Sequence, residues 1–217
     1  MDRLAKEMMR LIGSVWLIIL ISLLIGVGYG YQTTRYFVRY GLGPTSGAVS
    51  IGIVKELIPL LVALILSGWV GVAWTAETAS MKITEQISAL RTLGVSPVKF
   101  LVVPRVIACI IFHPVLVCFA GLACFFGQFF TALSLGVSAS TFLYMAKDFF
   151  QVYFLFRLLI KASIFGFGLA LISSYSGLYL KKKEESSAGI GKASIRSVVM
   201  NFFFIFLVNF LFSLLNN

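Results

Sequence analysis

The sequence predicts an all-α, multi-pass membrane protein. Hydrophobic residues make up 59% of the 217 residues and charged residues only 12%, whereas roughly 25% of a soluble domain is charged. Five apolar segments reach the roughly 20 residues that a helix needs to cross a bilayer. The segments between them are short, which leaves no room for a soluble catalytic domain. We therefore expect a single membrane domain over residues 1–217.

The predicted spans cover approximately residues 11–32, 54–75, 106–130, 153–180 and 197–215. The first follows a charged start, is too long for the core of a signal peptide and lacks a convincing cleavage site, so we expect it to be retained. The fourth contains Arg157 and Lys161 near its start. Its membrane-spanning part is therefore expected to begin inside that range.

The distribution of Lys and Arg predicts the orientation. Twelve lie on one side of the predicted spans and six on the other or within apolar runs. The richer side holds Arg3, Lys6, Arg10, Lys82, Arg91, Lys99, Arg105, Lys181, Lys182, Lys183, Lys192 and Arg196. The positive-inside rule places the N-terminus in the cytoplasm and, after five crossings, the C-terminus outside. The net charge of +10 thus reflects topology and does not indicate nucleic-acid binding.

Residues 76–92 predict a cytoplasmic amphipathic helix between the second and third spans. It carries Glu77, Lys82, Glu85, Gln86 and Arg91. A helix that lies passively on head groups carries mostly Lys and Arg, but this one carries both signs and is held by a span at each end. These features favour contact with a partner protein, and these five residues are the candidate contacts.

Three ionisable residues lie at or near membrane depth. Lys55 and Glu56 open the second span, and Lys161 lies within the fourth. Because such residues are costly in a bilayer, they tend to face a cavity or each other. They could form a polar rim for a lipid head group or act as interfacial anchors. The short Glu56 favours the first role, Lys161 allows either, and Arg157 favours an anchor.

The glycines of two spans leave two interpretations open. Gly26, Gly28 and Gly30 lie in the first span, and Gly68 and Gly71 in the second. Small residues let helices approach closely in lipid. They could serve packing within one subunit or a contact between two.

The sequence shows no catalytic set. Residues 189–194 resemble a phosphate-binding loop, but that motif requires Gly where Ser186 stands and Ser or Thr where Ala193 stands. The chain is therefore not expected to hydrolyse nucleotide by itself, and any ATP chemistry would belong to a partner.

No metal site is predicted either. Cys109, Cys118 and Cys124 lie in one apolar stretch without metal-binding spacing, so we expect small core residues. His113 precedes Pro114, where a kinked helix with a locally hydrogen-bonded imidazole is expected.

A series of ordered motifs runs through most of the chain from about residue 12. They are Glu56-Leu57-x-Pro59, Ser67-Gly68-x-x-Gly71, Ala76-Glu77, Met81-Lys82-x-Thr84-Glu85-Gln86-Ile87-x-Ala89-Leu90, Gly94-Val95-x-Pro97, Val103-Pro104-Arg105, Leu159-Ile160-Lys161-Ala162-Ser163-x-Phe165-Gly166 and the stretch over 187–199. Together these motifs closely resemble the MlaE/YrbE permease family, the membrane subunits of ABC-type lipid transporters.

The resemblance implies a homodimer with a lipid cavity between subunits, in the inner membrane of a diderm bacterium. It also implies a cytoplasmic ATPase subunit that carries ATP and Mg²⁺ and contacts the helix at 76–92, and a periplasmic MCE-domain protein. Phospholipid would move between the inner and outer membranes. Glu56 and Lys161 match positions near the lipid site.

Two departures from the family pattern are expected to matter. Members commonly carry an amphipathic region before the first span, whereas this chain starts only ten residues before Leu11, so we expect a difference at that edge. Residues 181–185 are also more charged than the corresponding loop in many members.

Two other classes of function remain. A secondary transporter would show inverted repeats and broken-helix ion sites, and the chain has no internal repeat. A non-transporting membrane scaffold could recruit a soluble partner through the same helix.

Overall fold

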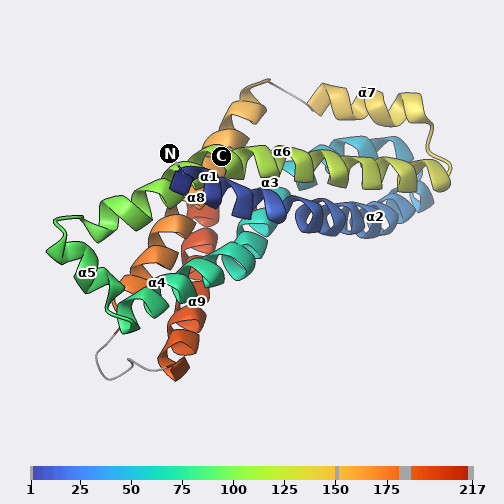
Figure 1. Cartoon of the computed structure of the whole chain (residues 1–217). Helices are drawn as coiled ribbons and strands as arrows, with labels where there is room; N and C mark the ends of the chain where they lie inside the picture. The colour runs from blue at the N-terminus through green and yellow to red at the C-terminus, as the bar shows by residue number, and fades with distance from the viewer. Residues whose placement is uncertain (1, 150–151, 181–186, 215–217) are drawn as a thin grey trace. The chain divides into compact units, whose positions relative to one another are not determined.

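The computed structural model describes residues 2–149, 152–180 and 187–214, and every regular element in those ranges is a helix (Figure 1). Within them, five helical stretches are long and apolar enough to cross a membrane. These are Arg3–Arg39, Gly43–Ile83, Val98–Ser134, Tyr153–Leu178 and Ala188–Leu214. The predicted all-α class and the five apolar spans are confirmed.

The chain divides into two compact units, and three helices continue from one unit into the other. One unit contains residues 15–62 and 114–160, and the other contains residues 1–14, 63–113 and 161–217. The helices that continue are α3 (Ser46–Leu66), α6 (Val103–Ser134) and α8 (Val152–Leu178). The single domain over residues 1–217 stays a prediction.

In the unit with residues 15–62 and 114–160, α2 (Val15–Arg39) packs closely along α6. A Cβ at Gly26 would lie 2.8 Å from the Cα of Cys124, and one at Gly30 would lie 2.8 Å from the Cα of Gln128. Gly28, on another face of α2, has no such neighbour within 4 Å. Gly26 and Gly30 therefore serve helix packing inside one subunit, because only a hydrogen side chain permits this approach.

The same unit contains a helix that the sequence reading missed, α7 (Ala139–Phe149). Phe142 of α7 is buried against Ala132 and Val137, with Phe125 and Phe129 packed around them. The short 3₁₀ turn η1 (Gly43–Thr45) joins α2 to α3. With 11 residues, α7 is too short to cross a bilayer, so a search for membrane spans passes over it.

In the other unit, α4 (Val72–Ile83) packs along α9 (Ser187–Leu214). α4 continues α3 through a π-helical turn, η2 (Ser67–Gly71). Ser173 of α8 joins these helices, because its hydroxyl accepts a 2.9 Å hydrogen bond from Asn201 and its carbonyl accepts one of 2.9 Å from Thr75.

The first predicted span contains a helix break near its start. Its expected start at residue 11 lies inside a separate helix, α1 (Asp2–Gly13), and the spanning helix α2 starts only at Val15. The break falls at Ser14, whose amide and hydroxyl both donate to the carbonyl of Leu11. α1 is amphipathic, because Leu4, Met8 and Leu11 share one face of the helix and Arg3, Lys6 and Arg10 share another. An amphipathic helix thus precedes the first spanning helix, and the expected difference from the family at this edge stays a prediction.

The single helix predicted over residues 76–92 is two helices in the structure. α4 ends at Ile83, and a short helix, α5 (Gln86–Thr92), follows. Glu85 has a left-handed backbone with φ of 57°, which turns the chain between them. No Gly or Pro marks this break, so the spacing of charged residues alone suggested a continuous helix. α5 is joined to α6 through a turn at Gly94 and a π-helical segment, η3 (Val98–Val102).

Two sequence features fall on or near α9. Residues 189–194 lie within this helix and not in a loop, which is not the geometry of a phosphate-binding loop. Ser186 and Lys181, Lys182 and Lys183 lie outside the described residues.

Candidate functional site

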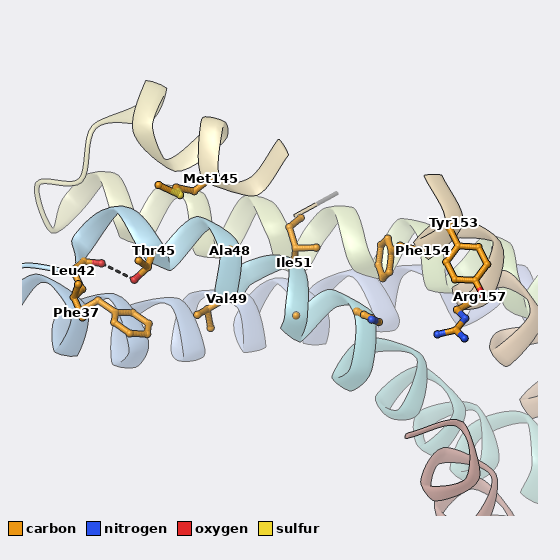
Figure 2. A pocket seen from close by; sticks show the side chains of 12 residues that line it. Phe37, Leu42, Thr45, Ala48, Val49, Ile51, Met145, Tyr153, Phe154 and Arg157 are labelled. Atoms are coloured by element: carbon orange, nitrogen blue, oxygen red, sulfur yellow. Dashed lines mark hydrogen bonds between the residues drawn. The ribbon is translucent and has the colours of Figure 1, made fainter. Parts of the chain in front are cut away.

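An apolar pocket with two cationic residues lies in the unit formed by residues 15–62 and 114–160. Its volume is about 750 Å³. Figure 2 shows Phe37 and Leu42 at one end and Tyr153 and Arg157 at the other. Lys55 of α3 also lines it, and the described lining residues include no acidic side chain. We call this the cationic pocket. It offers apolar walls and positive charge, the two features that an anionic amphiphile requires.

The Arg157 side chain is oriented by an aromatic neighbour. Its guanidinium carbon lies 4.7 Å from the centre of the Tyr153 ring, one turn earlier on α8 (Figure 2). A cation over a ring face is attracted by the negative charge of that face. Arg157, which the sequence favoured as an interfacial anchor, is thereby placed in the wall of the cationic pocket.

A second pocket in the same unit is more apolar. It has a volume of about 530 Å³ and shares Ile51 and Phe154 with the cationic pocket. Lys147 of α7 is the charged side chain among its described lining residues. The two pockets therefore adjoin at α3 and the start of α8, and together they enlarge the apolar surface available within this unit.

The three predicted lipid contacts do not share one pocket. Lys55 lines the cationic pocket, but Glu56 is absent from the described lining residues of both pockets. Glu56 is partly buried on α3. Lys161 is 4% exposed and belongs to the other unit. The roles of Glu56 and Lys161 at a lipid remain predictions.

Of the five candidate partner contacts, Glu77 is engaged inside the protein. In the unit with residues 1–14, 63–113 and 161–217, its carboxylate accepts a 3.1 Å hydrogen bond from Arg105. It also accepts a hydrogen bond from Arg10 of α1, and Lys6 lies 3.9 Å away. Glu77 thus joins α4 to α1 and α6.

Arg105 lies at the centre of this group and is fully buried. Its Nε donates to Glu7 over 3.3 Å and its Nη1 to Thr78 over 2.7 Å. Glu7 in turn accepts a 2.6 Å hydrogen bond from the indole of Trp74. A buried charge is tolerated when it is paired and hydrogen-bonded, and Arg105 meets both conditions. We call Glu7, Arg10, Glu77 and Arg105 the clamp.

Lys82, the second candidate contact, is also turned inward. Its ammonium donates to the carbonyls of Leu178, over 3.0 Å, and Leu180, over 2.6 Å, at the C-terminal end of α8. The last carbonyls of a helix have no partner within the helix and carry partial negative charge. Lys82 therefore caps α8 and ties the end of α4 to it.

The other three candidates are exposed. Glu85, Gln86 and Arg91 lie on the outside of the turn and of α5, and Ile87 is the buried residue of that helix. The carboxylate of Glu85 accepts a 2.5 Å hydrogen bond from Ser88. α5 thus presents charged and polar side chains on its surface, and Ile87 is the one side chain of this helix that is buried against the protein.

Sequence reasoning missed the clamp, although some signals were present. Glu7 and Arg10 are three positions apart, where helix neighbours meet, and Arg105 opens an apolar run, where a charge needs an internal partner. Arg10 and Glu77 are 67 residues apart, and Glu7 and Arg105 are 98 residues apart. Helical periodicity relates only near neighbours in the chain, so it could not predict these ion pairs. The pairing depends on how α1 folds back.

The cysteines and the histidine belong to the helix packing. Cys109 and Cys124 are buried free thiols, and Cys118 is partly buried. His113 is fully buried, and its ring meets that of Phe165 edge-on with centres 6.5 Å apart. No group of three or more His, Cys, Asp or Glu that could hold a metal ion occurs in the part of the chain that the structure describes.

Five apolar helices, an exposed short helix between two of them and an apolar pocket define a multi-pass α-helical membrane protein. Residues 5–215 match the family described as Permease MlaE. The chain therefore belongs to the MlaE permease family, which confirms the resemblance found in its motifs.

Relatives in bacteria and plants share most of this chain. A probable ABC transporter permease protein of Synechocystis is 33% identical over 214 residues, which cover 95% of this chain and 79% of the relative. A probable ABC transporter permease protein of Rickettsia typhi is 37% identical over 164 residues, which cover 75% of this chain and 62% of the relative. The chloroplast protein trigalactosyldiacylglycerol 1 of Arabidopsis thaliana is 30% identical over 206 residues, which cover 92% of this chain and 57% of the relative. The chain thus spans about three fifths to four fifths of these relatives.

Proposed function

We propose that this protein is the permease subunit of an ABC transporter that moves phospholipid between the inner and outer membranes. The observation that carries the proposal is the family match over residues 5–215, joined by relatives named as probable ABC transporter permeases. The chain would act without catalysis of its own. ATP and Mg²⁺ would bind to a separate cytoplasmic ATPase subunit, and two copies of the chain would form a homodimer around the lipid path.

The cationic pocket supports a lipid as the transported molecule. Its volume of about 750 Å³ is in the range of pockets that hold drug-sized ligands, roughly 300–1,000 Å³. Apolar residues such as Phe37 and Phe154 suit acyl chains, and Lys55 and Arg157 suit a phosphate. Arginine in particular presents donors that match phosphate oxygens. An anionic or zwitterionic phospholipid combines both chemistries.

The exposed α5 supports an ATPase contact. Glu85, Gln86 and Arg91 are exposed and carry both signs of charge, which suits a protein surface better than anionic lipid head groups. In this proposal α5 lies in the cytoplasm, as do α1 and the N-terminus. After five crossings the C-terminus lies in the periplasm, on the side of an MCE-domain partner, and the membrane is the inner membrane of a diderm bacterium.

The first experiment asks whether the chain assembles with an ATPase. A tagged chain is purified from its own host, the co-purifying ATPase subunit is identified by mass spectrometry, and ATP hydrolysis is measured. Reversal of charge at Glu85 and Arg91 together is expected to abolish co-purification, with reversal of the exposed Arg35 as a matched control. Absence of an ATPase from the unaltered protein would favour a scaffold or a secondary transporter.

The second experiment asks what the pocket holds. Lipids extracted from the purified complex are identified by mass spectrometry, and transport is followed between vesicles. Lys55→Ala is expected to lower both bound phospholipid and transport, whereas Arg35→Ala, which removes a cation outside the two apolar pockets, leaves both unchanged. Normal lipid content and transport in Lys55→Ala would remove the cationic pocket from the proposed lipid path.

A further inference from the structure

The clamp lies at the base of the hairpin that carries α5. α4 leads into this hairpin and α6 leads out of it. Arg105, at the start of α6, bonds to Glu77 over 3.1 Å and to Thr78 over 2.7 Å, both on α4. Both arms of the hairpin are thus joined by one buried side chain.

We propose that the clamp and Lys82 are positioning residues that hold α5 for the ATPase and transmit its movement to α4, α6 and α8. This inference rests on the proposed function, because it assumes that the ATPase contacts α5. It assigns Glu77 and Lys82 a different role from that of the exposed Glu85, Gln86 and Arg91. The first two would keep the hairpin in place, and the last three would contact the partner.

The geometry of Arg105 supports a rigid joint. A guanidinium is planar and presents its donors in fixed directions. Here Nε faces Glu7 of α1, whereas Nη1 and Nη2 face Thr78 and Glu77 of α4. Because the three partners come from two helices and Arg105 from a third, a relative shift of any one breaks a hydrogen bond in a buried place. An unmade buried bond to a charge is costly, so the helices are expected to move together.

α1 strengthens the same joint from outside the hairpin. Glu7 accepts a 2.6 Å hydrogen bond from Trp74 of α4. Arg10 forms a salt bridge with Glu7 over 3.8 Å and donates a hydrogen bond to Glu77. The guanidinium of Arg3 lies 3.6 Å over the ring of Phe100 on the outgoing arm. α1 therefore contacts both arms of the hairpin.

α5 itself has little to hold it. It has seven residues and one buried side chain, Ile87. The turns that flank it contain the left-handed residues Glu85 and Gly94. A segment with so few buried contacts opens locally at low cost. Its position must therefore come from the base of the hairpin, where the clamp joins α4 to α6 and Lys82 joins α4 to the end of α8.

Hydrogen exchange tests the positioning role without any partner. The purified full chain in nanodiscs is compared with Glu77→Gln and Arg105→Lys, and exchange is followed over residues 84–96. Both variants are expected to exchange severalfold faster there than the unaltered chain. Lys6→Gln is the control, since Lys6 is 60% exposed and 3.9 Å from Glu77, and it is expected to exchange at the unaltered rate. Unchanged exchange in folded Glu77→Gln or Arg105→Lys would overturn the proposal.

Coupling tests the role in the complex. In Glu77→Gln the ATPase is expected to co-purify in the normal amount, while lipid moved per ATP hydrolysed falls severalfold. Glu77→Asp, which restores the charge, is expected to recover part of that ratio. Loss of ATPase binding together with unchanged hydrogen exchange over residues 84–96 would instead make Glu77 a partner contact and overturn the positioning role.

The two proposals fail in different ways. If the unaltered chain brings no ATPase with it, the proposed function fails, but the exchange experiment still decides whether the clamp positions residues 84–96. If Glu77→Gln does not fold, Arg105→Lys carries both tests, and normal exchange and coupling in that variant would overturn the inference.

Discussion

At the scale of single residues, the main finding is the difference between paired and exposed charges. Arg105 is fully buried and Glu7 is 7% exposed, yet they face each other at 3.3 Å. Charges with such burial are uncommon unless they are paired. Glu77 and Arg105 appear in the sequence as ordinary charges next to apolar spans. The structure shows that their partners, not their positions along the chain, determine their roles.

Removal of one member of the clamp is expected to destabilise the protein. Glu7→Gln leaves Arg105 buried without one of its counter-charges, and breaking a buried pair from one side costs about 3–5 kcal/mol. We expect the free energy of unfolding in detergent, measured by chemical denaturation, to fall by an amount at the lower end of that range, because Gln can still accept from Trp74. Lys6→Gln, at an exposed pair, is expected to change it by less than about 1 kcal/mol. Equal effects of the two substitutions would contradict this account.

Gly26 and Gly28 offer a second matched pair. A Cβ at Gly26 would lie 2.8 Å from the Cα of Cys124, whereas at Gly28 nothing lies within 4 Å. Gly26→Val is expected to lower the free energy of unfolding by about 1–3 kcal/mol, as overpacking does. Gly28→Val should cause no loss, because Val is a better helix former than Gly. The same unfolding experiment measures both, and a tolerated Gly26→Val would mean that α2 and α6 do not approach so closely.

At the scale of elements, the segment between the second and third spans is a hairpin and not one amphipathic helix. α4 ends at Ile83, and Glu85 turns the chain into α5. The left-handed conformation costs an ordinary residue about 1–2 kcal/mol, so surrounding bonds must maintain it. The amide of Glu85 donates to Lys82 over 3.2 Å, and its carbonyl accepts from Ala89 over 3.0 Å. These bonds fix the direction in which α5 leaves α4.

Gly94 closes this hairpin on the other side of α5. Its φ is 73°, and a Cβ there would meet nothing within 4 Å, so a substitution is opposed by backbone conformation alone. Gly94→Ala is expected to lower the free energy of unfolding by about 1–2 kcal/mol and to weaken co-purification of the ATPase. Gly52→Ala within α3, where space is also open, should raise stability by about 0.5–1 kcal/mol. A neutral Gly94→Ala would show that the turn adopts another conformation.

At the scale of the whole molecule, we expect five crossings to place the two ends of the chain on opposite sides of the membrane. The same count predicts that α5 and the loop before α7 lie on opposite sides. Ser88 of α5 and Ser138 before α7 are both exposed. The positive-inside rule assigns α5 to the cytoplasm.

Labelling of single cysteines tests this topology. In a chain whose Cys109, Cys118 and Cys124 are replaced by Ala, Ser138→Cys is expected to react with an impermeant maleimide in intact spheroplasts. Ser88→Cys should react only after the membrane is opened. The opposite pattern would reverse the orientation, and labelling of both from one side would show that α6 does not cross the membrane.

The amino-acid sequence alone determined the class, the five apolar spans and the family. Hydrophobicity over about 20 residues is a local property that bilayer thickness imposes, and the motifs from Glu56 to Val199 are strings of neighbours. The short α7 was missed because its 11 residues pack against α6 and do not cross the bilayer. α1 was merged with the first span because its apolar residues run on into α2.

Only the tertiary structure decided which charged residues point inward. Glu77, Lys82, Glu85, Gln86 and Arg91 were equivalent as positions on one predicted helix. Folding brings α1 and α6 to Glu77 and the end of α8 to Lys82, and it leaves the other three exposed. The physical reason is that a charged side chain near apolar surroundings needs a polar or oppositely charged partner, and the fold determines which partner lies close. These partners lie 28 to 98 residues away in the chain.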